Sequence, residues 1–306
     1  MHPQKAYLDI VAGAALWGLM GLFVRALSAQ GYSSMEVIGL RAIAAVICVV
    51  PYLYFHDRGS FHVKFKDLWI FAGTGLLSEA FYNYGYFSCM EQTSLAVAAL
   101  LMYTAPAFVM VMSFIIFKEP FTLIKFCGLI TTFIGCAMVT GAFEEEMSLS
   151  LSGLIYGLIA GFGYACYSIF GKLAMIRGYS PVTVTFYTFL FASITGVSLV
   201  HSQATVFNFT TIIAALVLGS FCAVIPHCLY TLGLQTVAPG QASILATVEL
   251  FTAAIVGCFA FGETLSTMKL CGMALIFVTI VLLNMHRIDQ KPISRIKKAE
   301  SEKSEN

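Results

Sequence analysis

The sequence contains little charge. Only 11% of its 306 residues are Asp, Glu, Lys or Arg, against about 25% in an ordinary soluble domain. The net charge is +1 at pH 7, so no basic field indicates a nucleic-acid partner. Because 59% of the residues are hydrophobic, one core could not keep so much apolar surface out of water. These shortages exclude an ordinary soluble protein and favour one whose solvent is lipid.

Several motifs that carry chemistry are also missing. The sequence has no GxxxxGK[ST] loop for ATP, no HExxH zinc motif, no CxxC pair and no nucleophile elbow. Its nine cysteines lie almost all in apolar stretches, which is typical of free thiols used for packing and not of a disulfide framework. We therefore expect no enzyme, no metal site and no cofactor.

Long apolar runs are what the sequence does contain. A membrane-spanning helix needs about 20 mostly apolar residues. Ten segments meet this requirement, at 7–28, 34–55, 68–89, 94–116, 122–142, 152–174, 181–201, 209–233, 239–261 and 267–286. The sequence therefore predicts an all-α polytopic membrane protein with ten transmembrane helices and a polar, disordered tail at 289–306.

The distribution of Lys and Arg predicts the orientation of these helices. With the N-terminus inside, 14 of the 17 Lys and Arg residues lie in cytoplasmic loops or in the tail. Arg25 and Lys269 lie on the outer side, and Arg41 lies within a span. We expect a protein of the cell membrane with both termini in the cytoplasm.

The chain carries an internal repeat. The stretch "FKEPFTLIKFCG" at Phe117–Gly128 returns 144 residues later as "FGETLSTMKLCG" at Phe261–Gly272, and "GYSS" at Gly31–Ser34 matches "GYSP" at Gly178–Pro181. Ten spans give five to each copy, and because five is odd, the second copy is inverted. The sequence predicts two inverted five-helix repeats, 1–147 and 148–288, which is the architecture of many secondary transporters.

The repeated loop predicts one structural device used at both membrane surfaces. Thr122 and Ser266 are placed to cap the helices that follow them. The preceding Glu119 and Glu263 are expected to meet the free amides of those helices or the nearby Lys125 and Lys269. A role of the two glutamates in gating or in substrate binding is the alternative.

Two carboxylates are predicted inside the membrane, Glu79 in the third span and Glu249 in the ninth. Such a residue costs at least ~2.5–3.5 kcal/mol and usually faces a cavity. Helical spacing places Tyr82, Asn83 and Tyr86 on the same face as Glu79. The neighbours of Glu249 at helical spacing are small residues that leave room for a ligand or another helix, namely Ala242, Ala246, Ala253 and Gly257.

Further polar residues are expected near the same centre. His227 and Tyr230 lie in the eighth span, Tyr103 lies one turn before Pro106 in the fourth, and Arg41 could pair with Glu79. Weaker candidates are Trp17, Tyr164 and Tyr167. The alternative for each of these residues is plain packing. We expect Glu249 to bind the substrate or a proton, and Glu79 to support it.

The fourth and ninth spans carry a resemblance to a known family. The stretches "SLAVAALLMYTAPAFVMVMSFIIFKEPFT" and "GQASILATVELFTAAIVGCFAFGETLS", together with Arg41, resemble the drug/metabolite transporter superfamily and its EamA-type members, over about Leu8–Met285. The family often has Pro after the mid-helix Glu of the ninth span. Leu250 stands there instead, so we expect a straighter helix than the fourth span.

The resemblance implies a carrier of small metabolites that works as a monomer or homodimer in the lipid bilayer. We expect a secondary transporter that exports a small polar or amphipathic metabolite, with protons as a possible coupling ion. Uptake of an organic cation is the alternative, because carboxylates among aromatic rings suit a cation. A membrane-embedded enzyme or a receptor is a third reading, which nothing in the sequence favours.

Overall fold

Helices account for every regular element in residues 3–143, 150–199 and 208–285, the part of the chain that the computed structural model describes. The first half contains α1 (Pro3–Gly18), α2 (Met20–Ser28), α3 (Ser34–His56), η1 (Arg58–Phe61), η2 (Phe65–Asp67), α4 (Leu68–Ala72), η3 (Gly73–Phe81), α5 (Tyr82–Gln92), α6 (Leu95–Met102), α7 (Ala105–Phe117) and α8 (Leu123–Thr140). The second contains α9 (Leu151–Ile176), α10 (Pro181–Leu199), α11 (Phe209–Gly219), η4 (Ser220–Val224), α12 (Ile225–Leu234), α13 (Pro239–Ala246), α14 (Glu249–Phe261) and α15 (Thr267–Met285).

Within the described residues, each of the ten expected apolar segments is helical, which confirms an all-α polytopic membrane protein. Within the described ranges, seven segments are long and apolar enough to cross a membrane, and Pro181–Val197 and Thr267–Leu283 are shorter apolar helices. The remaining segment, from α4 to α5, is divided by the π-helix η3. The tail predicted at 289–306 lies outside the described residues, and the division into two inverted repeats stays a prediction.

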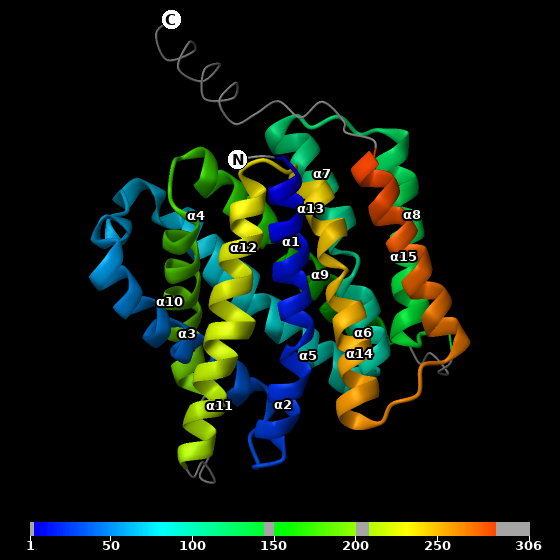
Figure 1. Ribbon diagram of the computed structural model, residues 1–306, viewed down its shortest axis with the longest axis horizontal. Coiled ribbons are helices and arrows are strands. Elements are labelled where there is room, and N and C mark those ends of the chain that lie inside the picture. Colours follow the sequence, from blue (N-terminus) through cyan, green and yellow to red (C-terminus); the bar gives the residue numbers. More distant parts are fainter. Residues whose placement is uncertain (1–2, 144–149, 200–207, 286–306) are drawn as a thin grey trace, which may run out of the picture.

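The largest helix contacts join the first half of the chain to the second. α8 packs along α15, α3 along α10, α1 against α12, and α5 against α9. Figure 1 shows α8 beside α15 at one side of the bundle and α3 near α10 at the other. Where α8 meets α15, a Cβ added to Gly272 would lie only 2.7 Å from the carbonyl oxygen of Gly135, so neither position has room for a larger residue. Small residues at helix crossings allow this close approach.

The repeated loops begin with the same helix ending. Lys118 after α7 and Gly262 after α14 both have left-handed backbones, with φ of 55° and 67°. The next amide then bonds back to the preceding helix, Glu119 N to Ser113 O at 3.3 Å and Glu263 N to Gly257 O at 3.1 Å. A left-handed residue followed by a hydrogen bond back to a carbonyl oxygen six residues earlier ends the helix and turns the chain.

Each repeated loop ends in the predicted N-cap. Thr122 Oγ1 accepts from the amide of Lys125 at 3.4 Å, and Ser266 Oγ accepts from the amide of Lys269 at 3.3 Å. The duplicated sequence therefore encodes one helix–turn–helix corner, built from a left-handed closure and a capped restart.

The fourth and ninth spans are both interrupted near their middle. α6 and α7 are separated by Tyr103 and Thr104, and α13 and α14 by Thr247 and Val248. In the ninth span the amides at the break bond three residues back, as Leu250 N does to Thr247 O at 3.0 Å. The ninth span is therefore interrupted without a proline, and its being straighter than the fourth span stays a prediction.

Two π-helical stretches occupy the middle of the third and eighth spans. η3 carries Glu79, and η4 ends three residues before His227. π-helical turns insert an extra residue into the helix and occur frequently at functional sites. Nothing in the residue pattern predicted these two stretches.

Candidate functional site

A central cavity of about 690 Å³ runs from the middle of the bundle toward the end where α2 and α14 finish. Eight of the nine site residues expected from the sequence line it, namely Arg41, Glu79, Tyr82, Tyr86, Tyr103, His227, Tyr230 and Glu249. The weaker candidates Trp17, Tyr164 and Tyr167 line it as well. Residues from seven different spans thus converge on one space.

Asn83 does not line the central cavity. Its side-chain Nδ2 donates to the backbone oxygen of Glu79 at 2.5 Å, and the residue lines a second, lateral pocket instead. The wider π-turn that precedes Tyr82 changes the angle between successive side chains. As a result Tyr82 and Tyr86 face the central cavity, whereas Asn83 faces away from it.

Glu79 is held in a buried cluster with Arg41 and His227. Its Oε2 accepts from Nη2 of Arg41, and its Oε1 meets Nε2 of His227 at 2.9 Å. The side chains of Arg41 and Glu79 are only 6% and 9% exposed. Nη1 of Arg41 contacts the sulfur of Met20 at 3.5 Å, and its Nε has no hydrogen-bond partner. Two charged side chains buried to this extent require such pairing, because burying an isolated charge costs a large amount of free energy.

The contacts of His227 tie this cluster to the first span. Nδ1 lies 2.8 Å from the carbonyl oxygen of Ala223, which would accept a proton from it, and 3.3 Å from Nε1 of Trp17, which would donate one to it. One ring nitrogen cannot serve both partners in a single protonation state. In either tautomer Glu79 keeps Arg41 as its cationic partner and His227 as its second hydrogen-bond partner.

Glu249 lines the same central cavity as Glu79 but has a different environment. It is the first residue of α14, and its carboxylate accepts from Tyr103 Oη at 2.5 Å and from Tyr164 Oη at 3.2 Å. The contacts of its side chain within the described residues are to hydroxyl groups and include no cation. The tightened turn at Thr247 and Val248 makes Glu249 the first residue of α14.

Aromatic rings fill the space around the two acids. The ring of Trp17 lies 5.0 Å from that of His227 and 5.4 Å from that of Tyr230. The ring of Tyr82 lies 5.6 Å from that of Tyr164. Trp17 and Tyr164 occupy matching positions of the two sequence copies. The sequence rated both as weak candidates, although this correspondence could have raised Tyr164, which touches Glu249 directly.

The small-residue stripe around Glu249 has two uses. Ala253 and Gly257 line the central cavity, while Ala242 and Ala246 are buried in an apolar cluster below it. The tightened turn before Glu249 separates these two pairs. Half of the stripe therefore leaves space for a ligand, and the other half serves helix packing.

An ion pair lies at the mouth of the cavity, and the sequence did not predict it. Nη2 of Arg25 in α2 meets Oε1 of Glu263 at 2.5 Å, with side chains 51% and 42% exposed. The Arg25 guanidinium also lies 4.1 Å from the ring centre of Phe261. The predicted partner of Glu263, Lys269, lines the same mouth but forms no ion pair with it. At the other loop the expected pair is present, since Lys125 Nζ lies 3.7 Å from Glu119 Oε2.

The opposite end of the bundle is closed. Nζ of Lys172 donates to the backbone oxygens of Leu234 at 2.6 Å and Val237 at 3.3 Å, which caps the end of α12. Tyr7 Oη donates to Oε1 of Gln241 at 3.1 Å. Buried apolar side chains fill the space between these contacts and the cavity floor. The cavity therefore has one open mouth and one sealed end.

Metal chemistry finds no support in this arrangement. Across residues 3–143, 150–199 and 208–285, no group of three or more His, Cys, Asp and Glu side chains is placed to hold a metal ion. The described cysteines are free thiols.

Comparison with known proteins gives the same picture from the sequence side. The chain is 28% identical over 277 residues to a protein of Archaeoglobus fulgidus named "Uncharacterized transporter", covering 89% of this chain and 94% of that protein. It is 25% identical over 170 residues to the mouse (Mus musculus) protein "Solute carrier family 35 member G1", covering 53% and 45%. A crystal structure with 15% sequence identity superposes with a TM-score of 0.77 over 92% of this chain and 97% of its own.

The family match accounts for both halves of the chain. The EamA-like transporter family matches twice, at residues 4–141 and 151–285. These two segments contain all the residues that line the central cavity. The chain is a multi-pass membrane protein that belongs to the EamA-like transporter family.

Proposed function

We propose that this protein exports a small polar or amphipathic metabolite by alternating access, and that Glu249 is the acid that binds the substrate or an exchanged proton. The supporting observation is the contrast between the two cavity acids. Glu79 is already neutralised by Arg41 and His227, whereas the partners of Glu249 among the described residues are tyrosine hydroxyls. An acid without a fixed counterion is free to exchange its partner during transport.

The charges on the cavity wall favour a polar substrate. Arg41 lines the cavity with a guanidinium whose buried Nε has no hydrogen-bond partner among the described residues, and Glu249 offers a carboxylate. An anionic group of a ligand would be attracted to the first and a cationic group to the second, with aromatic rings covering the apolar part between them. Charged and polar metabolites with some apolar surface therefore suit the site.

Alternating access needs a mouth that can close and a sealed end that can open. The Arg25–Glu263 pair connects α2 with the end of α14 at the mouth, and Lys172 with Glu119 and Lys125 lies at the sealed end. Arg25 and Lys172 match in the two sequence copies, as do Glu263 and Glu119. We infer that the ion pairs at the two ends break and form in alternation. This favours a gating role for Glu119 and Glu263 in addition to their structural role.

Uptake of an organic cation is the second candidate function. The ring wall around Glu249 favours it, because a cation is stabilised over aromatic faces. The neutralisation of Glu79 counts against cation uptake, since Glu79 is then not available as a second carboxylate for a cation. Counterflow in proteoliposomes with anionic, zwitterionic and cationic metabolites distinguishes the candidates by the class that exchanges.

The central test is Glu249→Gln. The amide keeps the shape of the side chain and its contact with Tyr103, but it cannot exchange a proton. We expect the variant to fold and insert, to retain counterflow of a neutral or anionic substrate, and to lose accumulation against a gradient. Glu91→Gln makes the same change at an exposed acid that does not line the cavity, and it should transport normally. Accumulation by Glu249→Gln at the wild-type rate and pH dependence would refute this role.

The proposed orientation places the cavity mouth outside the cell. Both termini then lie in the cytoplasm, and Arg25 and Glu263 face the exterior. Export in this state would begin from the sealed end, where Lys172 and Glu119 lie. Transport by inside-out and right-side-out vesicles, each with the substrate gradient imposed in both directions, measures the preferred direction.

A further inference from the structure

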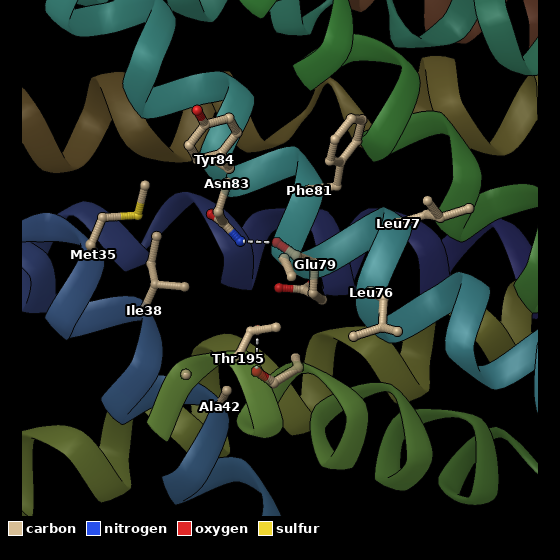
Figure 2. Close-up of a pocket in the computed structure, with 13 residues that line it drawn as sticks. Met35, Ile38, Ala42, Leu76, Leu77, Glu79, Phe81, Asn83, Tyr84 and Thr195 are labelled. Carbon is tan, nitrogen blue, oxygen red and sulfur yellow. Dashed lines mark hydrogen bonds between the residues drawn. The ribbon is translucent and has the colours of Figure 1, made fainter. Parts of the chain in front are cut away.

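A second pocket, separate from the central cavity, opens on the side of the bundle (Figure 2). Its volume is about 410 Å³, within the range of ligand sites in proteins. Its walls come from three elements: the start of α3, the segment from η3 into α5, and the later part of α10. The lining residues labelled in Figure 2 are Met35, Ile38, Ala42, Leu76, Leu77, Glu79, Phe81, Asn83, Tyr84 and Thr195.

The mouth of this lateral pocket is apolar and faces the lipid. Leu76, Leu77, Phe81 and Tyr84 are all exposed on the bundle surface and all line the pocket. They belong to the middle of the third span, so the solvent at that depth is hydrocarbon. Any molecule that enters the pocket must therefore come from the membrane.

The interior of the lateral pocket offers few free polar groups. Asn83 donates its amide hydrogen to the backbone of Glu79 at 2.5 Å, and Thr195 Oγ1 donates to the backbone of Ala192 at 2.8 Å. The carboxylate of Glu79 is paired with Arg41 and His227. An occupant is held by shape and apolar contact alone, which suits hydrocarbon and not a polar solute.

We propose that the lateral pocket binds one acyl chain of a bilayer lipid. The pocket is continuous with the lipid-exposed surface, and its lining would lose van der Waals contacts if it stayed empty. A lipid chain fills it without any cost of desolvation, because the chain moves from one apolar environment to another.

The bound acyl chain would pack against the outer side of residues that line the central cavity. Glu79 lines both spaces, so the π-helix η3 forms the wall between them. Ala42, which also lines the lateral pocket, follows Arg41 directly in α3. An acyl chain in the pocket therefore supports the two elements that hold the Arg41–Glu79 pair, and it links bilayer composition to the stability of the cavity.

Photo-crosslinking tests the occupant directly. Full-length protein is placed in vesicles of phosphatidylethanolamine and phosphatidylglycerol with a trace of phosphatidylcholine that carries a diazirine on one acyl chain. After irradiation, mass spectrometry should find adducts concentrated on Leu76, Leu77 and Thr195. Thr195→Phe places a ring in the pocket and should abolish these adducts, whereas Val197→Phe adds the same bulk to a lipid-facing position that does not line it and should leave them unchanged.

A thermal measurement gives a second readout. Adding phosphatidylglycerol to the detergent-purified protein should raise the melting temperature of the wild type and of Val197→Phe, and it should raise that of Thr195→Phe much less. If Thr195→Phe does not fold, Ala80→Leu fills the same pocket with a smaller change.

Two outcomes would overturn the proposal. One is uniform labelling of every lipid-facing helix, with no loss of adducts in the filled variant, which means that the pocket holds no lipid chain. The other is loss of the adducts when a transported metabolite is added, which means that the pocket admits substrate. Both are independent of the role of Glu249, since neither depends on accumulation of substrate.

Discussion

Removing one member of the Arg41–Glu79 pair should destabilise the protein far more than removing both. The two side chains are 6% and 9% exposed, and breaking such a buried pair costs about 3–5 kcal/mol, because the other charge is left without a partner. Glu79→Gln should lower the melting temperature by about 10 °C at ~2–4 °C per kcal/mol. The double variant Arg41→Gln/Glu79→Gln buries no unpaired charge and should recover most of that loss.

The third member of the cluster makes the two single variants unequal. After Arg41→Gln, the carboxylate keeps its contact with Nε2 of His227 at 2.9 Å, so part of the charge is still compensated. After Glu79→Gln, Arg41 has no acid within the cluster. We therefore expect Glu79→Gln to be the more damaging of the two.

The assay is a double-mutant cycle on detergent-purified protein, with the free energy read from thermal or denaturant unfolding. The exposed pair Arg25 and Glu263 provides the control, because a pair that is 51% and 42% exposed should couple by only about 0.2–1 kcal/mol. Simple additivity at Arg41 and Glu79, with the double variant losing as much as both singles together, would refute the reasoning.

Three further predictions concern the loops and the topology. Lys118→Gly should raise the unfolding free energy by up to ~1 kcal/mol, because a left-handed φ of 55° is costly for a residue with a Cβ; Gly262→Ala, where an added Cβ meets nothing, should lower it by a similar amount, and equal melting of all three proteins would contradict this. Burial raises the pKa of the Glu119 carboxyl above its ordinary value of 4.5, with Lys125 opposing the shift. The folded state then binds the proton more tightly than the unfolded state, so the contribution of Glu119 to stability is present below about pH 4.5 and declines as pH rises above it. In Glu119→Gln the melting temperature should change less with pH across that range. Cysteines introduced at the exposed positions Gly59 and Thr264, in a background without native cysteines, should label oppositely with an impermeant maleimide. The first should react from the cytoplasmic side and the second from the outside, and labelling of both from one side would overturn the proposed topology.

Much of the fold could be predicted because membrane helices leave a strong signal in a single sequence. The ten apolar segments matched ten helical segments, and the caps at Thr122 and Ser266 lay where the residue types placed them. Backbone hydrogen bonds cannot be left unpaired in lipid, so an apolar run of sufficient length has little choice but to be helical.

The candidate site was predicted in composition and only partly in arrangement. Nine polar and aromatic residues near the middle of the membrane were expected to face a cavity, and all of them except Asn83 line it. The pairing of Glu79 with Arg41 was anticipated, but its contact with His227 was not, because those two residues meet across 148 residues of chain. The Arg25–Glu263 pair was missed for the same reason.

The sequence by itself determined which segments are helical, because length and hydropathy act locally along the chain. It also determined the repeated corner, since a left-handed closure and an N-cap each depend on a few neighbouring residues. Only the tertiary structure decided that Glu79 is neutralised while Glu249 keeps hydroxyl partners, because that difference depends on side chains from six separate spans. It also decided where the ninth span is interrupted and where η3 widens, since packing against neighbouring helices outweighs the weak local preferences of the residues at those positions.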